Sequence, residues 1–260
     1  MTTVTLTNEA LASHNSYTAP SPRKAKPRKP LRFSSYRPVG RGIISIPRQC
    51  RRNITRFFES ITIEQVKQYT ADWQTIIPQS DHEALNRWRF AYCTVHTPWL
   101  RSCEQYDKIK PTFENADYQA LAKILRRTSG GMWDIKANGI AKLHDYWNDA
   151  PEMFDTQPNW QKYRNELANK LPKLGLAKTS FAIEMLHPMD AQVICIDRHM
   201  FKAFGWENVD LACSDAQYHY YENYWVDMSN SYLVPPVLSR NLFWDIIQNQ
   251  TSSLYWANYL

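Results

Sequence analysis

The turn at residues 171–178, LPKLGLAK, is one segment whose residue types and spacing could do chemistry. A glycine turn that opens a helix leaves backbone N–H groups pointing outward beside the positive end of the helix dipole. The N–H groups of Leu174, Gly175 and Leu176 could therefore hold a phosphate, and Lys173 and Lys178 would add positive charge. Helical hairpins of this composition also occur as plain packing corners, so the turn alone leaves both interpretations open.

An aspartate follows this turn, at the start of another predicted helix. The apolar run 193–196, VICI, leads directly into Asp197, and the segment RHMFKA comes after it. The helix dipole and nearby donors would keep the carboxylate ionised, and dry surroundings would let its charge act strongly. Asp197 is thus a candidate catalytic carboxylate; the alternative is that it serves only as an N-cap.

Two helices joined by the turn must position these groups. Trp160, Tyr163, Leu167 and Leu171 recur at spacings of three, four and four, which places them on one face of a helix that Asn159 could cap. Proline ends this helix at position 172, and a second apolar periodic run continues over 176–186. The hairpin therefore spans about 160–186, and the aspartate lies in a second segment, 193–204.

Together these segments resemble the helix-hairpin-helix DNA glycosylases, the HhH-GPD superfamily. The motif of that family begins roughly LPG-hydrophobic-G, continues into a helix with K and T-A, and ends after that helix in hydrophobic-D-x-H-hydrophobic. LPKLGLAKTS and ICIDRHMF follow it in order and spacing. The segment 131–137, GMWDIKA, is similar to the family's G-aromatic-x-x-K-A segment, so the resemblance covers about residues 83–205.

The resemblance implies a fold, an activity and site residues. The fold would be mostly α-helical and two-lobed, with an extended basic N-terminal arm. The activity would be that of a DNA N-glycosylase, which flips a damaged or modified base out of duplex DNA and hydrolyses its N-glycosidic bond. Asp197 would stabilise the positive charge that builds on the sugar. The loop 94–99 would insert a wedge into the space left by the base, with His96 as the best candidate; the alternative is that His96 is a capping residue.

The chain departs from the family pattern inside the turn. Lys173 replaces the first hairpin glycine, and in an ungapped register Ala177 takes the position of the lysine that forms a Schiff base in bifunctional members. That register predicts a monofunctional enzyme in which water attacks the sugar, and we favour it because helix starts tolerate insertions poorly. A one-residue insertion would instead bring Lys178, about 100 degrees further around the helix, to that position and predict lyase activity.

No resident metal or cofactor is expected, apart from a monovalent cation that the hairpin could hold. Only Cys213 follows Asp197, so the iron-sulfur signature of some family members is absent. The five cysteines form no C-x-x-C pair, which indicates neither a disulfide framework nor a zinc site and is typical of a reducing compartment.

The composition predicts a protein of the cell interior. Its 260 residues suffice for a full core, and the chain has neither an apolar run of about 18 residues nor a signal-type N-terminus. We therefore expect a monomer without membrane association that binds double-stranded DNA, either in the cytoplasm with the nucleoid or in the nucleus.

Positive charge is concentrated at the front of the chain. Residues 1–60 hold 12 Lys and Arg against 2 acidic residues, whereas residues 61–260 hold 19 against 23. Residues 1–53 mix Pro, Ser, Gly and Arg without helical periodicity, so we expect a flexible or extended arm that contacts phosphates, followed by a helical domain over 54–260. The alternatives for the arm are a solvated tail or a localisation-type basic run.

Further helices are predicted around this site. They cover 52–58, 62–73 with Thr62 as a cap, a segment starting at Ser80 or Asp81, 118–127 and 238–247. The C-terminal segment 251–260 is expected to pack against the body. Trp99, Trp133 and Tyr36 are candidate walls of a base pocket, but the sequence does not name the base.

Three other functions stay open. A DNA-binding module that has lost catalysis is favoured slightly by Lys173 and opposed by the retained Asp197. A base-modifying enzyme on the same scaffold would act on an unusual base without excising it. A helical protein unrelated to DNA would require the motif spacing and the basic arm to be coincidental. Release of a free base, with an abasic site left behind, would separate excision from the first two.

Overall fold

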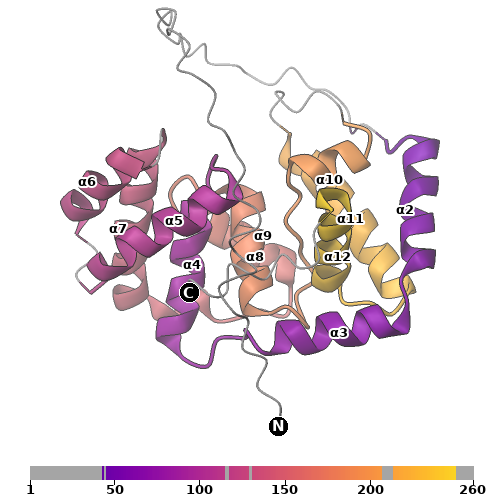
Figure 1. Ribbon diagram of the computed structural model, residues 1–260, viewed down its shortest axis with the longest axis horizontal. Helices are drawn as coiled ribbons and strands as arrows, with labels where there is room; N and C mark the ends of the chain where they lie inside the picture. The colour runs from indigo at the N-terminus through magenta and orange to yellow at the C-terminus, as the bar shows by residue number, and fades with distance from the viewer. Residues whose placement is uncertain (1–42, 44, 115–116, 129–130, 207–212, 250–260) are drawn as a thin grey trace, which may run out of the picture. The chain divides into compact units, whose positions relative to one another are not determined.

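The computed structural model describes residues 43, 45–114, 117–128, 131–206 and 213–249, and every regular element in these ranges is a helix (Figure 1). The predicted mostly α-helical class is therefore confirmed. The α-helices are α2 (Arg48–Ser60), α3 (Ile63–Gln74), α4 (Asp81–Cys93), α5 (Trp99–Ile109), α6 (Tyr118–Thr128), α7 (Trp133–Asp149), α8 (Trp160–Lys170), α9 (Gly175–Leu186), α10 (Arg198–Ala203), α11 (Asp215–Ser231) and α12 (Pro236–Gln248). Two short 3-10 helices, η1 (Lys110–Thr112) and η2 (Pro151–Phe154), follow α5 and α7.

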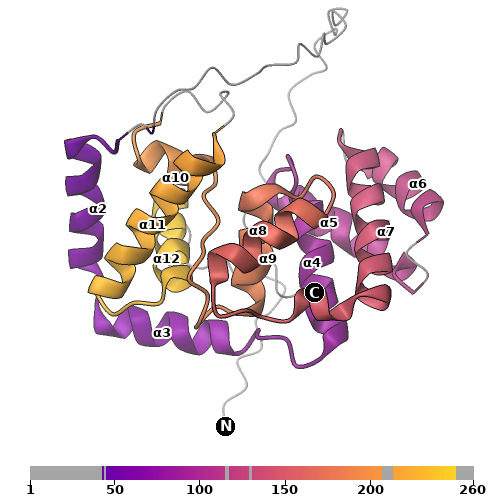
Figure 2. The same ribbon diagram turned by 180° about the vertical axis from the view of Figure 1, so that it is seen from behind.

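The helices form two groups on either side of the pair α8 and α9. Helix α4 packs against α5, α7 and α9, and α6 packs against α5 and α7. On the other side, α11 packs against α2 and α12, and α10 packs against α12 (Figures 1 and 2). Helix α3 runs beneath the second of these groups and contacts α12. These two groups are the two lobes that the resemblance implied.

Each lobe has its own hydrophobic core rich in aromatic rings. The first core includes Phe90 and Tyr106, both fully buried, whose ring centroids lie 5.5 Å apart with an edge-to-face geometry. The second core includes Phe58 and Trp225, with centroids 5.1 Å apart. Large rings in these arrangements bury much apolar area with few rotatable bonds, so each lobe offers rigid walls to a site between them.

The predicted helix starts are confirmed where a side chain caps the backbone. Thr62 forms a capping box with Gln65 at the start of α3, and Ser80 accepts a hydrogen bond from the Glu83 N–H at the start of α4. Asn159 accepts from the Lys162 N–H at the start of α8. These caps satisfy N–H groups that the first helical turn leaves without partners.

Helix α2 begins at Arg48, ahead of residue 54, where the sequence predicts the helical domain to start. Cys50, Ile54 and Phe58 recur every four residues, and Ile54 and Phe58 are buried in the second core. The surrounding arginines hid this periodicity in the sequence. Ile46 is also buried, so this part of the predicted arm packs on the body. The arm residues 1–42 and 44 and the C-terminal segment 251–260 lie outside the described residues.

None of the helices in the described ranges is both long enough and apolar enough to cross a membrane.

Candidate active site

An extended segment, residues 193–196, runs between the two cores and leads into Asp197. Val193 and Cys195 belong to the first core, whereas Ile194 and Ile196 belong to the second. Side chains of an extended chain alternate between its two faces, so one uninterrupted apolar run can serve both cores. The segment has no strand partner in the described part of the chain. Residues 193–196 therefore form an extended connection and not a strand of a sheet.

Buried side chains replace the missing strand partners of this segment. Backbone N–H groups buried without acceptors would cost free energy, so each needs a partner. The acceptors are Glu222 Oε1 for the Ile194 N–H (3.1 Å), Glu184 Oε1 for the Cys195 N–H (2.8 Å) and Tyr218 Oη for the Ile196 N–H (3.0 Å). The Tyr218 hydroxyl also donates to the Ile194 carbonyl at 2.8 Å. Helices α9 and α11 thereby fix the backbone that delivers Asp197.

Both glutamates are held by buried arginines. Arg164 donates two hydrogen bonds to Glu222, at 2.9 and 2.8 Å, and both side chains are fully buried. Arg240 on α12 pairs in the same way with Glu184. Burial raises the pKa of the Glu184 carboxyl, while the charge of Arg240 opposes that rise. The extended segment is therefore coupled to two buried ion pairs.

The Asp197 carboxylate is oriented from two directions. Its Oδ1 accepts hydrogen bonds from the N–H groups of His199 and Met200, both at 2.9 Å, so it is the N-cap of α10. Its Oδ2 accepts the indole Nε1–H of Trp244 at 3.0 Å. Asp197 is therefore an N-cap, as the simpler interpretation held, but it also carries a partner from α12 that capping does not require.

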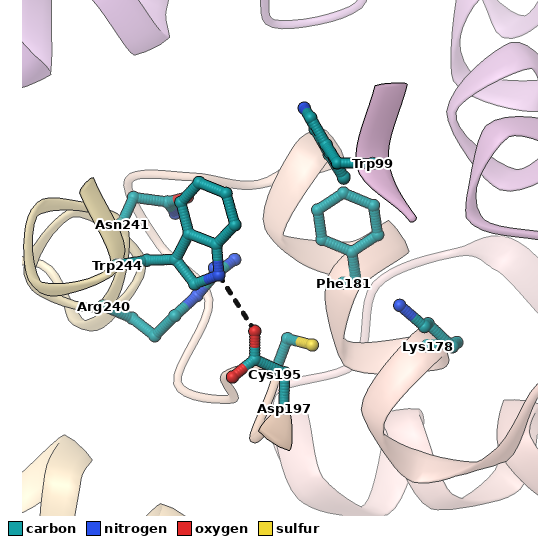
Figure 3. A pocket seen from close by; sticks show the side chains of 8 residues that line it. All are labelled: Trp99, Lys178, Phe181, Cys195, Asp197, Arg240, Asn241 and Trp244. Atoms are coloured by element: carbon teal, nitrogen blue, oxygen red, sulfur yellow. Dashed lines mark hydrogen bonds between the residues drawn. The ribbon is translucent and has the colours of Figure 1, made fainter. Parts of the chain in front are cut away.

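The Asp197 side chain lines a pocket between the lobes (Figure 3). Its walls come from α5, α9, α12 and the extended segment, and the lining side chains are Trp99, Lys178, Phe181, Cys195, Asp197, Arg240, Asn241 and Trp244. Burial raises the pKa of the Cys195 thiol to about 12, so this residue does not supply a thiolate. The nucleophile candidate that the pocket offers is the amine of Lys178.

Lys178 and Ala177 take different directions from α9. The Ala177 side chain packs against both hydrophobic cores, whereas Lys178 lines the pocket and lies with its ammonium 5.6 Å from the Phe181 ring centroid. In the ungapped register, Ala177 takes the position of the lysine that forms a Schiff base in bifunctional glycosylases. Lys178 and Asp197 line the same pocket.

The hairpin keeps the backbone of a glycine turn even where the glycine is missing. Lys173, which replaces the family's first glycine, has φ 62°, and Gly175 has φ 67°, both in the left-handed region. A non-glycine residue in this region costs roughly 1–2 kcal/mol, so the turn geometry is maintained against local strain. The hairpin residues 173–178 line a groove together with His96, at the surface next to the pocket.

The His96 loop is anchored by a buried lysine. Lys136 on α7 donates to the carbonyl of Cys93 at 2.9 Å, to the Thr97 hydroxyl and to Gln105 Oε1 at 2.8 Å. Burial lowers the pKa of Lys136 to about 8, and the charge of Lys178 adds to this effect. His96 itself is exposed with φ 48° and lines the hairpin groove, not the Asp197 pocket.

Several pocket residues could not be found from the sequence. Trp99, a predicted wall, does line the pocket, but Trp133 lies against Arg126, with 5.6 Å from guanidinium carbon to ring centroid. Tyr36 lies outside the described residues. Trp244 and Asn241 come from the last helix, and no motif connects them to Asp197. Their only signal is a helix predicted from its Pro-Pro start.

Solved structures of 8-oxoguanine DNA glycosylases share this fold. The enzyme from Methanocaldococcus jannaschii has 15% identity and a TM-score of 0.63, covering 78% of this chain and 95% of its own. The enzyme from Thermotoga maritima has 14% identity and a TM-score of 0.63, covering 78% and 99%. The M. jannaschii 8-oxoguanine glycosylase/lyase in complex with a 15mer DNA containing 8-oxoguanine has 15% identity and a TM-score of 0.63, covering 76% and 97%. No protein-family model and no curated protein sequence matches the chain. The chain has the fold of these glycosylases.

Proposed function

We propose that this protein is a DNA glycosylase that extrudes one nucleotide from duplex DNA and cleaves the bond between its base and its sugar. The observation that carries the proposal is a pocket that Asp197, Lys178 and aromatic side chains line together. The fold shared with 8-oxoguanine DNA glycosylases supports it. A base is inaccessible inside a duplex, so the enzyme must first flip it out, at a cost of about a few kcal/mol.

The pocket walls suit a flat heterocycle. Trp99, Phe181 and Trp244 present ring surfaces on which an extruded base can stack, with about 1–3 kcal/mol per stacked base. The Asn241 amide donates its Nδ2–H to the Val237 carbonyl at 2.8 Å. Its Oδ1 has no hydrogen-bond partner among the described residues and is available to accept an N–H of the base.

The Lys178 amine attacks the sugar carbon that carries the base. The base leaves with the bonding electron pair and takes up a proton, while the amine loses a proton and forms a Schiff base with the opened sugar. Asp197 stabilises the positive charge that develops on the sugar during this step. Elimination of the 3′ phosphate then cuts the strand. Trp244 acts on this reaction through Asp197, which it holds in place.

Lys178 is assigned this role because it faces the pocket and Ala177 does not. This revises the preference for a monofunctional enzyme that the ungapped register gave. Water directed by Asp197 is the competing mechanism, and it would release the same base but leave the strand intact.

The surfaces around the pocket are assigned to the DNA backbone. The N–H groups of residues 174–176, with Lys173, hold phosphates next to the extruded nucleotide, and His96 enters the space that the base leaves. The part of the predicted arm 1–53 that precedes α2 adds phosphate contacts that depend on salt. The monovalent cation at the hairpin stays a prediction.

The proposal is tested by incubating the protein with a panel of end-labelled duplexes, each with one altered base. The panel starts with 8-oxoguanine, the substrate named for the structural neighbours, and includes uracil, thymine opposite guanine, alkylated adenine and hydroxymethylated pyrimidines. Each reaction is split into samples with and without hot alkali. We expect release of a free base from at least one duplex and strand cleavage without alkali.

Matched variants separate catalysis from binding. Asp197→Asn should keep duplex affinity and reduce base release about 100-fold to 1000-fold. Near-normal turnover of this variant would overturn the assignment of Asp197. Binding of every duplex without release of any base would support a DNA-binding protein instead, and a changed but unreleased base would support a base-modifying enzyme.

A further inference from the structure

Helix α2 carries four exposed arginines on one side, which we call the arginine face. Its members, spaced to share one face of a helix, are Arg48, Arg51, Arg52 and Arg56. Ile54 and Phe58 of the same helix are buried in the second core. The four arginines line a shallow groove with Thr55 and Glu59. None of them forms an ion pair with another residue in the part of the chain that the structure describes.

The positions of these arginines lower the stability of α2. Like charges four residues apart, such as Arg48 with Arg52 and Arg52 with Arg56, repel one another. The first turn of α2 contains no acidic residue, and Pro47 offers no side-chain cap, so its arginines also face the positive end of the helix dipole. An anion outside the protein would relieve both effects.

The start of the arginine face lies next to α10, the helix whose N-cap is Asp197. A Cβ placed on Gly205, just after α10, would lie 2.9 Å from Cγ of Pro47 and 3.1 Å from Sγ of Cys50. The start of α2 therefore touches the end of α10, which has 6 residues and a length of about 9 Å. Helix α10 itself exposes Arg198 and Lys202. Exposed cations thus continue from the catalytic segment onto α2.

We propose that the arginine face binds the phosphate backbone of duplex DNA beside the extruded nucleotide. The inference rests on the proposed function. The start of α2 lies about one length of α10, about 9 Å, from Asp197, so the contact begins roughly three base pairs from the target, at about 3.4 Å per base pair. The arginines recognise only the spacing of the phosphate charges, so the contact does not depend on the base sequence. It strengthens binding to duplexes long enough to reach α2.

The test uses two variants of the full chain with the same change in net charge. In the first, the four residues of the arginine face are replaced by Gln, which keeps helix propensity and removes the repulsion. In the control, Gln replaces four exposed cations on other helices, Lys67, Lys108, Lys123 and Arg127. Affinity for an 8-oxoguanine duplex of about 20 base pairs is measured by fluorescence anisotropy at several salt concentrations.

We expect the arginine-face variant to bind the duplex at least about 10-fold more weakly than wild type. The magnitude of its slope of log K against log salt should be smaller by about 2–4, since each lost phosphate contact removes about 0.9. The control should retain the wild-type slope. On a duplex that ends two base pairs beyond the target on each side, wild type and variant should bind equally. Equal slopes on the long duplex, or an equal loss in the control, would overturn the inference.

Base release separates this outcome from failure of the proposed function. At saturating protein, the arginine-face variant should release the base at the wild-type rate, because no member of the face lines the pocket. If wild type releases no base while the slopes still differ, the inference about DNA contact holds and the proposed catalysis fails. If wild type releases the base and the slopes agree, the proposed catalysis holds and the inference about DNA contact fails.

Discussion

The buried pair of Glu184 and Arg240 is predicted to be a main determinant of the stability of the site. Glu184 is fully buried, and its Oε1 also accepts the Cys195 N–H. Glu184→Gln keeps an acceptor for that N–H but leaves the Arg240 charge buried without a counter-charge. Removing one partner of such a pair costs about 3–5 kcal/mol. For a domain of this size, 1 kcal/mol shifts Tm by about 2–4 °C, so Tm should fall by about 6–20 °C.

Urea unfolding at pH 7, followed by circular dichroism, measures this loss. The control is Asp145→Asn, which breaks the exposed pair of Lys142 and Asp145 (3.2 Å) and should cost no more than about 1 kcal/mol. The double variant Glu184→Gln with Arg240→Met should recover part of the loss, because it removes both charges.

A loss in Glu184→Gln no larger than that in Asp145→Asn would refute this reasoning. It would mean that Glu184 is already protonated in the folded protein, in line with the upward effect of burial on its pKa. Arg240 would then be held by neutral acceptors, and the extended segment would not depend on an ion pair.

Three further predictions concern the residues around the pocket. Trp244→Phe removes the donor to Asp197 but keeps a ring, and should slow single-turnover base release about 10- to 100-fold without changing duplex affinity; an unchanged rate would contradict a positioning role. Lys173→Gly should raise the free energy of unfolding by about 0.5–1 kcal/mol because φ is 62° there, while weakening DNA binding; a less stable variant would argue against strain. The folded pKa of Lys136 is about 8, below its ordinary value of 10.5, so the unfolded chain binds more protons between these pH values. The free energy of unfolding of wild type, relative to that of Lys136→Met, should therefore increase with pH from about 8 to about 10.5. A difference in urea unfolding that stays constant with pH would contradict this.

Local patterns predicted the elements that carry the site. Asn159, Thr62 and Ser80 act on N–H groups within their own first turns, so a short window of sequence contains both the cap and its target. The Asp197 segment was predicted for the same reason, since its apolar run and its helix are contiguous.

Contacts between distant parts of the chain were beyond sequence reasoning. Trp244 reaches Asp197 from another helix, and Arg240 reaches Glu184 in the same way, with nothing in either sequence segment that names the partner. The direction of Lys178 depended on how the hairpin absorbs one residue, which spacing alone left open. Helix α2 was partly missed because arginines interrupted an apolar period that only the second core reveals.

The measurement that tests the central claim most directly is borohydride trapping on the duplex that the protein cleaves, followed by peptide mapping of the adduct. If Lys178 is the nucleophile facing Asp197, borohydride should link protein to DNA, the adduct should map to Lys178, and Lys178→Gln should abolish it while keeping duplex affinity. Base release with no trapped adduct, and strand cleavage only after alkali, would contradict this account and assign the attack to water. An adduct at another lysine would contradict it as well.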